Sequence, residues 1–469
     1  MIGSKKRYHF VGIGGTGMSG LASVLMSEGA SISGSDLREC RETRMLQQAG
    51  AVIALGHDAH HVDRPLDGVI ISSAVATNNV EVVAAKAREI PILFRLHALA
   101  SLLVRYQSIG IAGTHGKSTT SAMTATILRE AGLDPSYLIG AHCPALGGNA
   151  HRGGGDWFVA EIDESDGLFT AVRPSIAVVT NIGKDHLQTY HDLEEIERAF
   201  RRYALQADRA VLAIDDPHVA RLARIVPDAM TVGLTESARL RADRIRHHRF
   251  DTTFDLLFDG TAVARLSLPA PGAHNVRNAL CALGAAALAG VDLRRAAESL
   301  ESFALPHRRF ELLEENGVIV IDDYAHLPEE VEATLSAIRS GWPDRRVVAI
   351  FQPHRYSRTR DLGMEFGAAF RGADVAVVSS IYPACEAPLP GVTSQVVVDA
   401  IRASTAADVH SIPDKSNVLA FLEATVRPGD FIVSFGAGDI WTVTESLASF
   451  LTGSRFLETH SAGSRSPNA

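Results

Sequence analysis

A short glycine-rich turn that carries a lysine and several hydroxyls is the segment of this sequence best suited to chemistry. It consists of Gly113, Thr114, His115, Gly116, Lys117, Ser118 and Thr119. An apolar run at 109–112 precedes it, and a helical pattern at 120–128 follows. Glycines let backbone N–H groups approach phosphate oxygens, and the start of a helix adds positive potential. We therefore predict a phosphate loop for ATP or GTP, with Lys117 at the terminal phosphates and Ser118 as a Mg²⁺ ligand.

Acidic residues and a histidine follow two later apolar runs. Glu161 closes the run 158–161 and opens a turn with four acids in six residues, whereas His186 follows the run 176–181. A carboxylate at a strand end beside a phosphate loop suits Mg²⁺, and His186 could bind a second ion. The same residues also fit a solvated acidic turn and a capping or core histidine. The two strand ends support a common metal site only if the two strands are adjacent in one sheet.

A second glycine-rich turn lies close to the N-terminus. Gly12, Gly14 and Gly17 have the spacing of a dinucleotide-binding turn, and Asp36 ends the next predicted strand. This geometry holds a pyrophosphate at a helix start, with the acid on a ribose hydroxyl. It serves NAD(P) and a UDP-sugar equally, and a plain packing turn would show the same glycines.

Polar side chains also gather in the second half of the chain. Asn275 and Asn278 are three positions apart at the start of an alanine-rich helix, so they share a face that suits the adenine edge or an N-cap. Asp323 ends one predicted strand, and Arg355 and Arg358 follow another. With Arg360 they make three arginines in six residues at a strand end, which favours a site for a carboxylate or phosphate over surface ion pairs.

The elements that must position these residues alternate between strand and helix along the chain. Such alternation predicts an α/β fold with mainly parallel sheets, whose sites lie at the carboxyl ends of the strands. We expect three domains at 1–107, 108–303 and 304–452, followed by a flexible tail at 453–469.

Composition narrows the classes of protein further. The 469 residues are 46% hydrophobic and 21% charged, with a net charge of −9. The negative charge argues against a nucleic-acid partner, and no apolar run is long enough to span a membrane. Four scattered cysteines, Cys40, Cys143, Cys281 and Cys385, indicate reduced thiols. With no signal peptide evident, we expect a cytoplasmic protein.

In their order along the chain, these motifs resemble the Mur ligases of peptidoglycan synthesis. The segments that carry the resemblance are 12–20, 113–117, 164–167, 180–182, 185–186, 274–279, 308–310, 322–324 and 351–361. The last segment resembles most the member that adds L-alanine to UDP-N-acetylmuramate. The resemblance implies a Rossmann-like N-terminal domain, a central P-loop ATPase domain and a Rossmann-like C-terminal domain.

The resemblance also implies an activity. It is an ADP-forming ligation in which the muramoyl carboxylate takes the γ-phosphate of ATP, and the amine of L-alanine then displaces phosphate from the acyl phosphate. The implied cofactors are ATP and two Mg²⁺ ions. The implied partners are small molecules alone, and the chain would act in the cytoplasm as a monomer or homodimer.

Roles for individual residues follow from the same resemblance. The implied catalytic residues are Lys117, Glu161, His186 and His326. The implied metal ligands are Ser118, Glu161 and His186. The implied ATP contacts are Gly113 to Thr119 with Asn275, Asn278, Arg309 and Asp323. The implied UDP-sugar contacts are Gly15, Thr16, Gly17, Asp36 and Ser73. The implied amino-acid contacts are Tyr324, Arg355 and Arg358.

Four positions depart from the family pattern. Ser118 replaces the more usual Thr, Leu327 replaces a histidine, Cys385 replaces a glycine and Ser101 replaces a glutamate. They leave open a paralogue that adds another amino acid or a peptide. A non-catalytic nucleotide-binding regulator and an NAD-linked oxidoreductase are the alternatives from other classes.

Overall fold

The first sheet is built from the N-terminal alternation of strands and helices. The computed structural model describes residues 2–186, 189–315 and 317–453. Five strands pair in the order β3-β2-β1-β4-β5, all parallel. They are β1 Arg7–Val11, β2 Ser31–Asp36, β3 Val52–Leu55, β4 Gly68–Ile71 and β5 Ile92–Phe94. The helices between and after them are α1 Thr16–Ser27, α2 Arg41–Gln48, the short 3-10 helix η1 Ala59–Val62, α3 Val80–Ala87 and α4 Arg95–Leu103.

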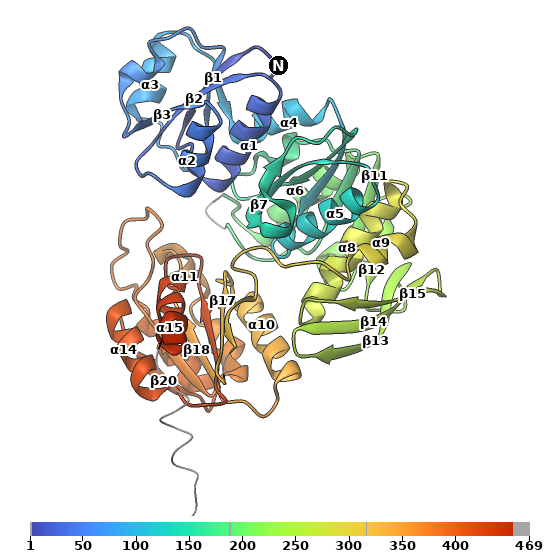
Figure 1. Ribbon diagram of the computed structural model, residues 1–469, viewed down its shortest axis with the longest axis vertical. Coiled ribbons are helices and arrows are strands. Elements are labelled where there is room, and N and C mark those ends of the chain that lie inside the picture. The colour runs from blue at the N-terminus through green and yellow to red at the C-terminus, as the bar shows by residue number, and fades with distance from the viewer. Residues whose placement is uncertain (1, 187–188, 316, 454–469) are drawn as a thin grey trace, which may run out of the picture. The chain divides into compact units, whose positions relative to one another are not determined.

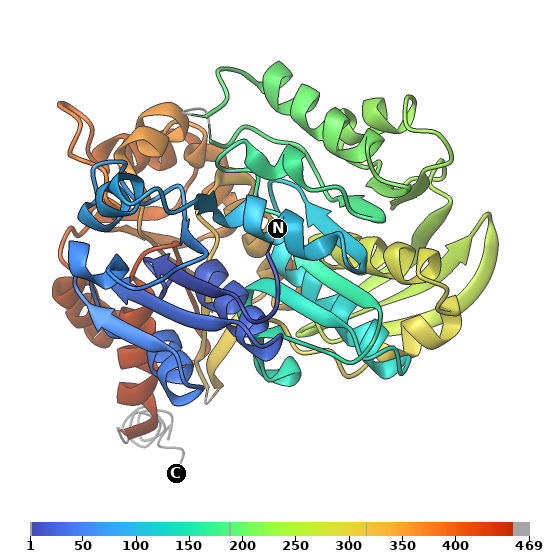
Figure 2. The same ribbon diagram turned by 90° about the horizontal axis from the view of Figure 1, so that it is seen from above.

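The second sheet has ten strands in the order β15-β14-β13-β12-β11-β10-β6-β9-β7-β8. Strands β6, β7, β9, β10, β11, β12 and β13 pair in parallel, while β8 is antiparallel to β7. The strands are β6 Gln107–Ala112, β7 Ser136–Cys143, β8 Gly148–His151, β9 Trp157–Glu161, β10 Ile176–Val179, β11 Arg209–Ala213, β12 Met230–Gly233, β13 Leu240–His248, β14 Asp251–Phe258 and β15 Thr261–Leu268. The helices are α5 Lys117–Glu130, η2 Pro144–Leu146, η3 Leu168–Ala171, α6 Leu193–Leu205, α7 Pro217–Ala223, α8 Ala273–Leu288 and α9 Leu293–Ser299. In Figure 2 the strands β13 to β15, coloured yellow-green, form one end of this sheet.

The third sheet has six strands in the order β16-β17-β21-β18-β19-β20, and only the edge strand β16 is antiparallel. The strands are β16 Glu311–Glu315, β17 Ile319–Asp323, β18 Val347–Phe351, β19 Val375–Val378, β20 Asp408–Ser411 and β21 Phe431–Phe435. The helices are α10 Pro328–Gly341, α11 Tyr356–Leu362, α12 Phe366–Ala369, η4 Phe370–Gly372, α13 Gln395–Ser404, α14 Lys415–Thr425 and α15 Trp441–Gly453. Apolar residues of α14 and α15 pack on one face of this sheet, where Figure 1 shows these two helices side by side in red.

Three mainly parallel sheets with helices between their strands confirm the predicted α/β fold class. By compactness the chain divides into two units. One holds the first sheet and most of the second, and the other holds the third sheet with the segments 247–252 and 270–273, of which the first joins β13 to β14. The exact domain boundaries stay a prediction. The predicted tail lies outside the described residues except for Gly453, which ends α15. No helix in the described part of the chain has the length and apolar character needed to cross a membrane.

Candidate active site

The predicted phosphate loop connects β6 to α5 in the middle of the second sheet. Gly116 precedes the helix with a φ of 80°, and Gly113 has a φ of 144°. Both values lie in the left-handed region that glycine tolerates best. A Cβ on Gly113 would lie 2.0 Å from Thr180 Oγ1, and a Cβ on Gly116 would lie 2.2 Å from Asn278 Oδ1. Both glycines are therefore required by backbone conformation and by the tight packing of the loop.

The segment after β10 holds this loop in place. The Asn181 carboxamide oxygen accepts a hydrogen bond from His115 N at 2.8 Å, and Thr180 Oγ1 donates to the His115 carbonyl at 2.6 Å. The Thr114 hydroxyl accepts from Gly183 N at 2.8 Å. The sequence marked Thr180 and Asn181 only as part of a family motif. They shape the loop because β10 pairs with β6 in parallel, and a local sequence pattern does not predict which strands pair.

Lys117 lies at the first position of α5 with its side chain turned back over the loop. Its ammonium donates to the Gly113 carbonyl at 2.5 Å and pairs with Glu164 Oε1 at 2.9 Å. Burial alone would lower the pKa of Lys117, but the nearby carboxylates, with Glu164 first, raise it. Burial raises the pKa of Glu164 to about 7, against the effect of Lys117. Lys117 therefore lies at the loop in its protonated form, and its partner Glu164 has a pKa near neutral pH.

The strand order puts the two predicted metal-binding segments on either side of the loop. Strand β9, which ends at Glu161, and strand β10, which leads to His186, each pair with β6. The two strands are therefore separated by β6, so the adjacency that the sequence-based interpretation required is absent, and a shared metal site stays a prediction. Ser118 is buried at the start of α5. Glu161 Oε2 accepts a hydrogen bond from Gly140 N at 2.6 Å, and His186 Nε2 lies 3.2 Å from Asp185 Oδ2.

Arg95 was not found by sequence reasoning, although it lies between the N-terminal glycine-rich turn and the acidic turn after β9. Its guanidinium pairs with Asp163 in the acidic turn at 3.0 Å. A Cβ on Gly17, in the N-terminal turn, would lie 2.9 Å from Arg95 Nη1. Burial alone would raise the pKa of Asp163, but the charges of Arg95 and Lys117 lower it. A lone arginine at a helix start gives no sequence signal of such a bridge.

Asn278 lies under the phosphate loop on α8. Its Oδ1 accepts a hydrogen bond from Thr120 Oγ1 at 3.4 Å, and its Nδ2 donates to Asn275 Oδ1 at 3.3 Å. Both asparagines are buried, so they share one face of the helix as the spacing predicts. Their contact with adenine stays a prediction.

The N-terminal turn joins β1 to α1, and its predicted residues share one edge of the first sheet. Gly15 precedes α1, which begins at Thr16. Asp36, at the end of β2, accepts a hydrogen bond from Gly14 N at 2.8 Å, so it holds the turn. Ser73 is exposed just after β4. Because β2 and β4 flank β1 in parallel, these groups follow the carboxyl ends of neighbouring strands.

A cluster of rings and one arginine lies at the ends of β17 and β18 in the third sheet. The His326 ring lies 5.4 Å from the Tyr324 ring and 5.6 Å from the His354 ring, measured between centroids. The His354 ring stacks on Tyr382 at 5.7 Å, and its Nδ1 lies 2.9 Å from Arg358 Nη1. The structure thus brings together three predicted residues, Tyr324, His326 and Arg358, with two that the prediction did not include.

Arg355 stands next to this cluster in an unusual backbone conformation. Its φ is 70°, and its backbone N donates to the Tyr382 carbonyl at 2.8 Å. Its buried Nε has no hydrogen-bond partner among the described residues. Strained backbone and an unsatisfied buried donor gather at binding sites more often than elsewhere, which favours a ligand here.

The remaining predicted residues of the third sheet lie around Tyr324. The Arg309 guanidinium lies 5.0 Å from the centre of its ring. Asp323 is buried and accepts hydrogen bonds from Phe310 N at 3.1 Å and Ala325 N at 2.8 Å. Burial raises the pKa of Asp323 to about 6, against the effect of the Arg309 charge. The contacts of Arg309 and Asp323 with ATP stay a prediction.

Known proteins match this chain over nearly its whole length. Sequence profiles match at residues 7–107 (Mur ligase family, catalytic domain), 111–286 (Mur ligase middle domain) and 308–438 (Mur ligase, glutamate ligase domain). The UDP-N-acetylmuramate--L-alanine ligase of Pelobacter propionicus is 43% identical over 96% of this chain and 99% of its own length. That of Geotalea daltonii is 44% identical over 95% and 98%.

Solved structures agree with these relatives. The crystal structure of UDP-N-acetylmuramate-alanine ligase from Thermotoga maritima is 29% identical, covers 98% of this chain and 100% of its own, and has a TM-score of 0.81. A MurF ligase from the same organism, solved with ADP, is 16% identical with a TM-score of 0.63 and shares the fold. The chain belongs to the Mur ligase family.

Proposed function

We propose that this protein is an ATP-dependent, ADP-forming ligase that joins L-alanine to UDP-N-acetylmuramate, an early cytoplasmic step of peptidoglycan synthesis. The observation that carries the proposal is the phosphate loop, with Lys117 beside it, in a chain 43% identical over 96% of its length to a ligase of that name. A phosphate loop alone supports nucleotide binding. The near-complete alignment with such ligases supports the substrates.

The chemistry requires two anions, the muramoyl carboxylate and the γ-phosphate, to meet. Lys117 is protonated and close to the loop carbonyls, so it can neutralise phosphate oxygens once its ammonium leaves Glu164. The buried hydroxyl of Ser118 and the carboxylate of Glu161 form an oxygen donor set that fits Mg²⁺. His186 would be the ligand of a second ion. Bound Mg²⁺ would supply positive charge to the transferred phosphoryl group.

Other residues bind and orient the substrates in this proposal. Gly15, Thr16, Gly17, Asp36 and Ser73 bind the UDP-sugar, whereas Asn275, Asn278, Arg309 and Asp323 bind ATP. Tyr324, Arg355 and Arg358 hold the amino acid, because a guanidinium pair anchors a carboxylate and leaves the amine free to attack. His326 orients the incoming amine from the ring cluster. The protein would act as a monomer or homodimer.

The test is ADP release by the purified protein with Mg²⁺, ATP and UDP-N-acetylmuramate, with L-Ala, Gly, L-Ser, D-Glu and a tripeptide supplied in parallel. Release that needs both the sugar nucleotide and L-Ala is the expected result. The absence of release with every acceptor, despite ATP binding, would instead identify a nucleotide-binding regulator. Binding of a nicotinamide cofactor would favour an oxidoreductase.

A ligase for another amino acid or a peptide is the second candidate, since two family positions differ near the ring cluster. Leu327 is buried just before α10, where the family carries a histidine. Cys385 has a φ of 69°, a conformation that suits the family's glycine better. ADP release with the tripeptide or D-Glu in place of L-Ala would favour this candidate.

A further inference from the structure

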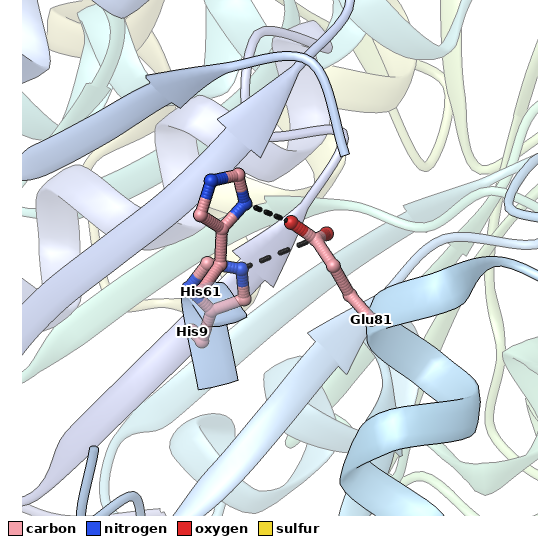
Figure 3. Close-up of side chains that lie close together, drawn as sticks. All are labelled: His9, His61 and Glu81. Atoms are coloured by element: carbon pink, nitrogen blue, oxygen red, sulfur yellow. Dashed lines mark hydrogen bonds and ion pairs between the residues drawn. The ribbon is translucent and has the colours of Figure 1, made fainter. Parts of the chain in front are cut away.

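A buried cluster of two histidines and a glutamate lies in the first sheet, away from the residues assigned above. His9 projects from β1, His61 from η1 and Glu81 from the first turn of α3 (Figure 3). His9 and Glu81 are buried, whereas the His61 side chain is 23% exposed. One ligand atom from each residue lies within 4.8 Å of the other two. Among the described residues, no other three side chains of His, Cys, Asp or Glu bring their ligand atoms this close together.

The hydrogen bonds around His9 leave one of its nitrogens facing the carboxylate. Its Nδ1 lies 3.0 Å from Ser33 Oγ. Its Nε2 is buried, accepts or donates no hydrogen bond within the described part of the chain, and lies 3.7 Å from Glu81 Oε2. This separation is too long for a hydrogen bond. It is close to the distance between two ligands of one tetrahedral Zn²⁺, about 3.3 Å for bonds of about 2.0 Å.

Glu81 places a carboxylate in the interior of the first domain, where a charge needs a partner. Among the described residues, the side chains within ion-pair distance of it are the imidazoles of His9, His57 and His61. A cation held between the carboxylate and two of these imidazoles would supply that partner.

The surroundings fix the donors in the way that metal sites do. Ser35 Oγ donates to Glu81 Oε2 at 2.6 Å, and His57 Nδ1 lies 3.2 Å from the same oxygen. Together with the contact between Ser33 and His9, these hydrogen bonds fix the orientation of His9 and Glu81 from the side away from the ion, as outer-shell partners do in zinc sites. His61 hydrogen-bonds Glu81 directly, so a small rotation of the carboxylate must open that contact when an ion enters.

We propose that His9 Nε2, His61 Nδ1 and the Glu81 carboxylate form a Zn²⁺ site with a fourth position open to solvent on the His61 side. Two imidazoles and a carboxylate are donors that Zn²⁺ accepts readily, whereas Mg²⁺ and Ca²⁺ prefer an all-oxygen set. The site does not depend on the proposed ligase activity.

The ion would tie η1 to β1 and α3. Ser35 links the site to the N-terminal glycine-rich turn. Its hydroxyl donates to Glu81, and its carbonyl accepts hydrogen bonds from Gly12 N at 2.8 Å and Ile13 N at 3.0 Å. Zn²⁺ binding therefore stiffens the loop that supports this turn. A rise in the thermal unfolding midpoint with added Zn²⁺ is the expected sign of binding to the folded state.

The direct test compares two neighbouring variants of the full chain. The change His61→Gln keeps a group that can donate to Glu81 but removes the imidazole, and His61 is exposed enough for the fold to tolerate it. The matched control is His60→Gln, because His60 is 84% exposed and pairs with Asp63 instead. Zn²⁺ binding is measured by competition with a chromophoric chelator, after metal stripping and with excess Mg²⁺ present.

The wild type and His60→Gln should each bind one Zn²⁺ at the same affinity, and His61→Gln should bind at least ~100-fold more weakly. A second measurement needs no variant: Zn²⁺ should protect His61 of the wild type, but not His60, from carbethoxylation. No Zn²⁺ binding by the wild type, equal binding by His61→Gln or unprotected His61 would each overturn the site.

Discussion

The role of the phosphate loop can be tested with two glycines that have almost the same backbone conformation. Gly116 precedes α5 with a φ of 80°, and Gly132 follows the same helix with a φ of 78°. A Cβ on Gly132 would meet nothing within 4 Å, whereas one on Gly116 would lie 2.2 Å from Asn278 Oδ1. The changes Gly116→Ala and Gly132→Ala therefore carry the same backbone strain and differ in this one contact.

The strain of alanine in the left-handed region costs about 1–2 kcal/mol in both variants. In Gly116→Ala the Asn278 side chain must also move, which breaks its contacts with Thr120 and Asn275. Each lost hydrogen bond costs about 0.5–1.5 kcal/mol, so the extra cost is about 1–3 kcal/mol. If the loop escapes this cost by leaving its phosphate-binding conformation, ATP affinity falls by roughly 5- to 150-fold.

The assay is ATP binding by isothermal titration calorimetry, with the thermal unfolding midpoint measured in parallel. We expect Gly132→Ala to lower the midpoint and keep the wild-type ATP affinity. Gly116→Ala should lower both. An ATP affinity of Gly116→Ala within twofold of that of Gly132→Ala would refute the reasoning, because the contact with Asn278 would then have no effect on the loop.

Three further predictions follow from the same geometry. Lys117→Ala should abolish ADP release while leaving UDP-sugar binding nearly intact, since the ammonium touches the loop and Glu164 rather than the first sheet; surviving turnover would contradict the loop assignment. Arg355→Ala should raise the KM for the amino acid by about 10- to 100-fold and leave the KM for ATP unchanged, because it removes a charge-assisted hydrogen bond to the amino acid. The control is Arg360→Ala, since Arg360 is exposed and pairs with Asp361. Equal effects of Arg355→Ala on the two KM values would exclude this role. Glu164 keeps its proton in the folded state to about pH 7, compared with its ordinary value of 4.5. The folded state thus binds more protons between these pH values, and stability falls by up to ~3 kcal/mol as the pH rises through them. The change Glu164→Gln should flatten this part of a plot of unfolding midpoint against pH, and an unchanged slope would show that Glu164 is not its source.

Much of the fold follows from local patterns in the sequence. The helix after the phosphate loop, the strand that ends at Glu161 and the helix that begins with Ala273 all occur where alternation and periodicity predict them. The glycines at 113 and 116 are also explained locally, because a turn that exposes backbone N–H groups needs positive φ values. These features depend on residues a few positions apart, which a single sequence displays directly.

The partners of those residues depend on contacts that are distant in sequence. Asn278 supports Gly116 from a helix more than a hundred residues away, and Lys117 pairs with Glu164, a partner that the sequence did not predict. The order β10-β6-β9 decides that Thr180 and Asn181 shape the loop. The sequence by itself determined the elements, the loop and the types of chemistry available. Only the tertiary structure decided which side chains meet, because strand order and packing are set by burial across the whole sheet rather than by local preference.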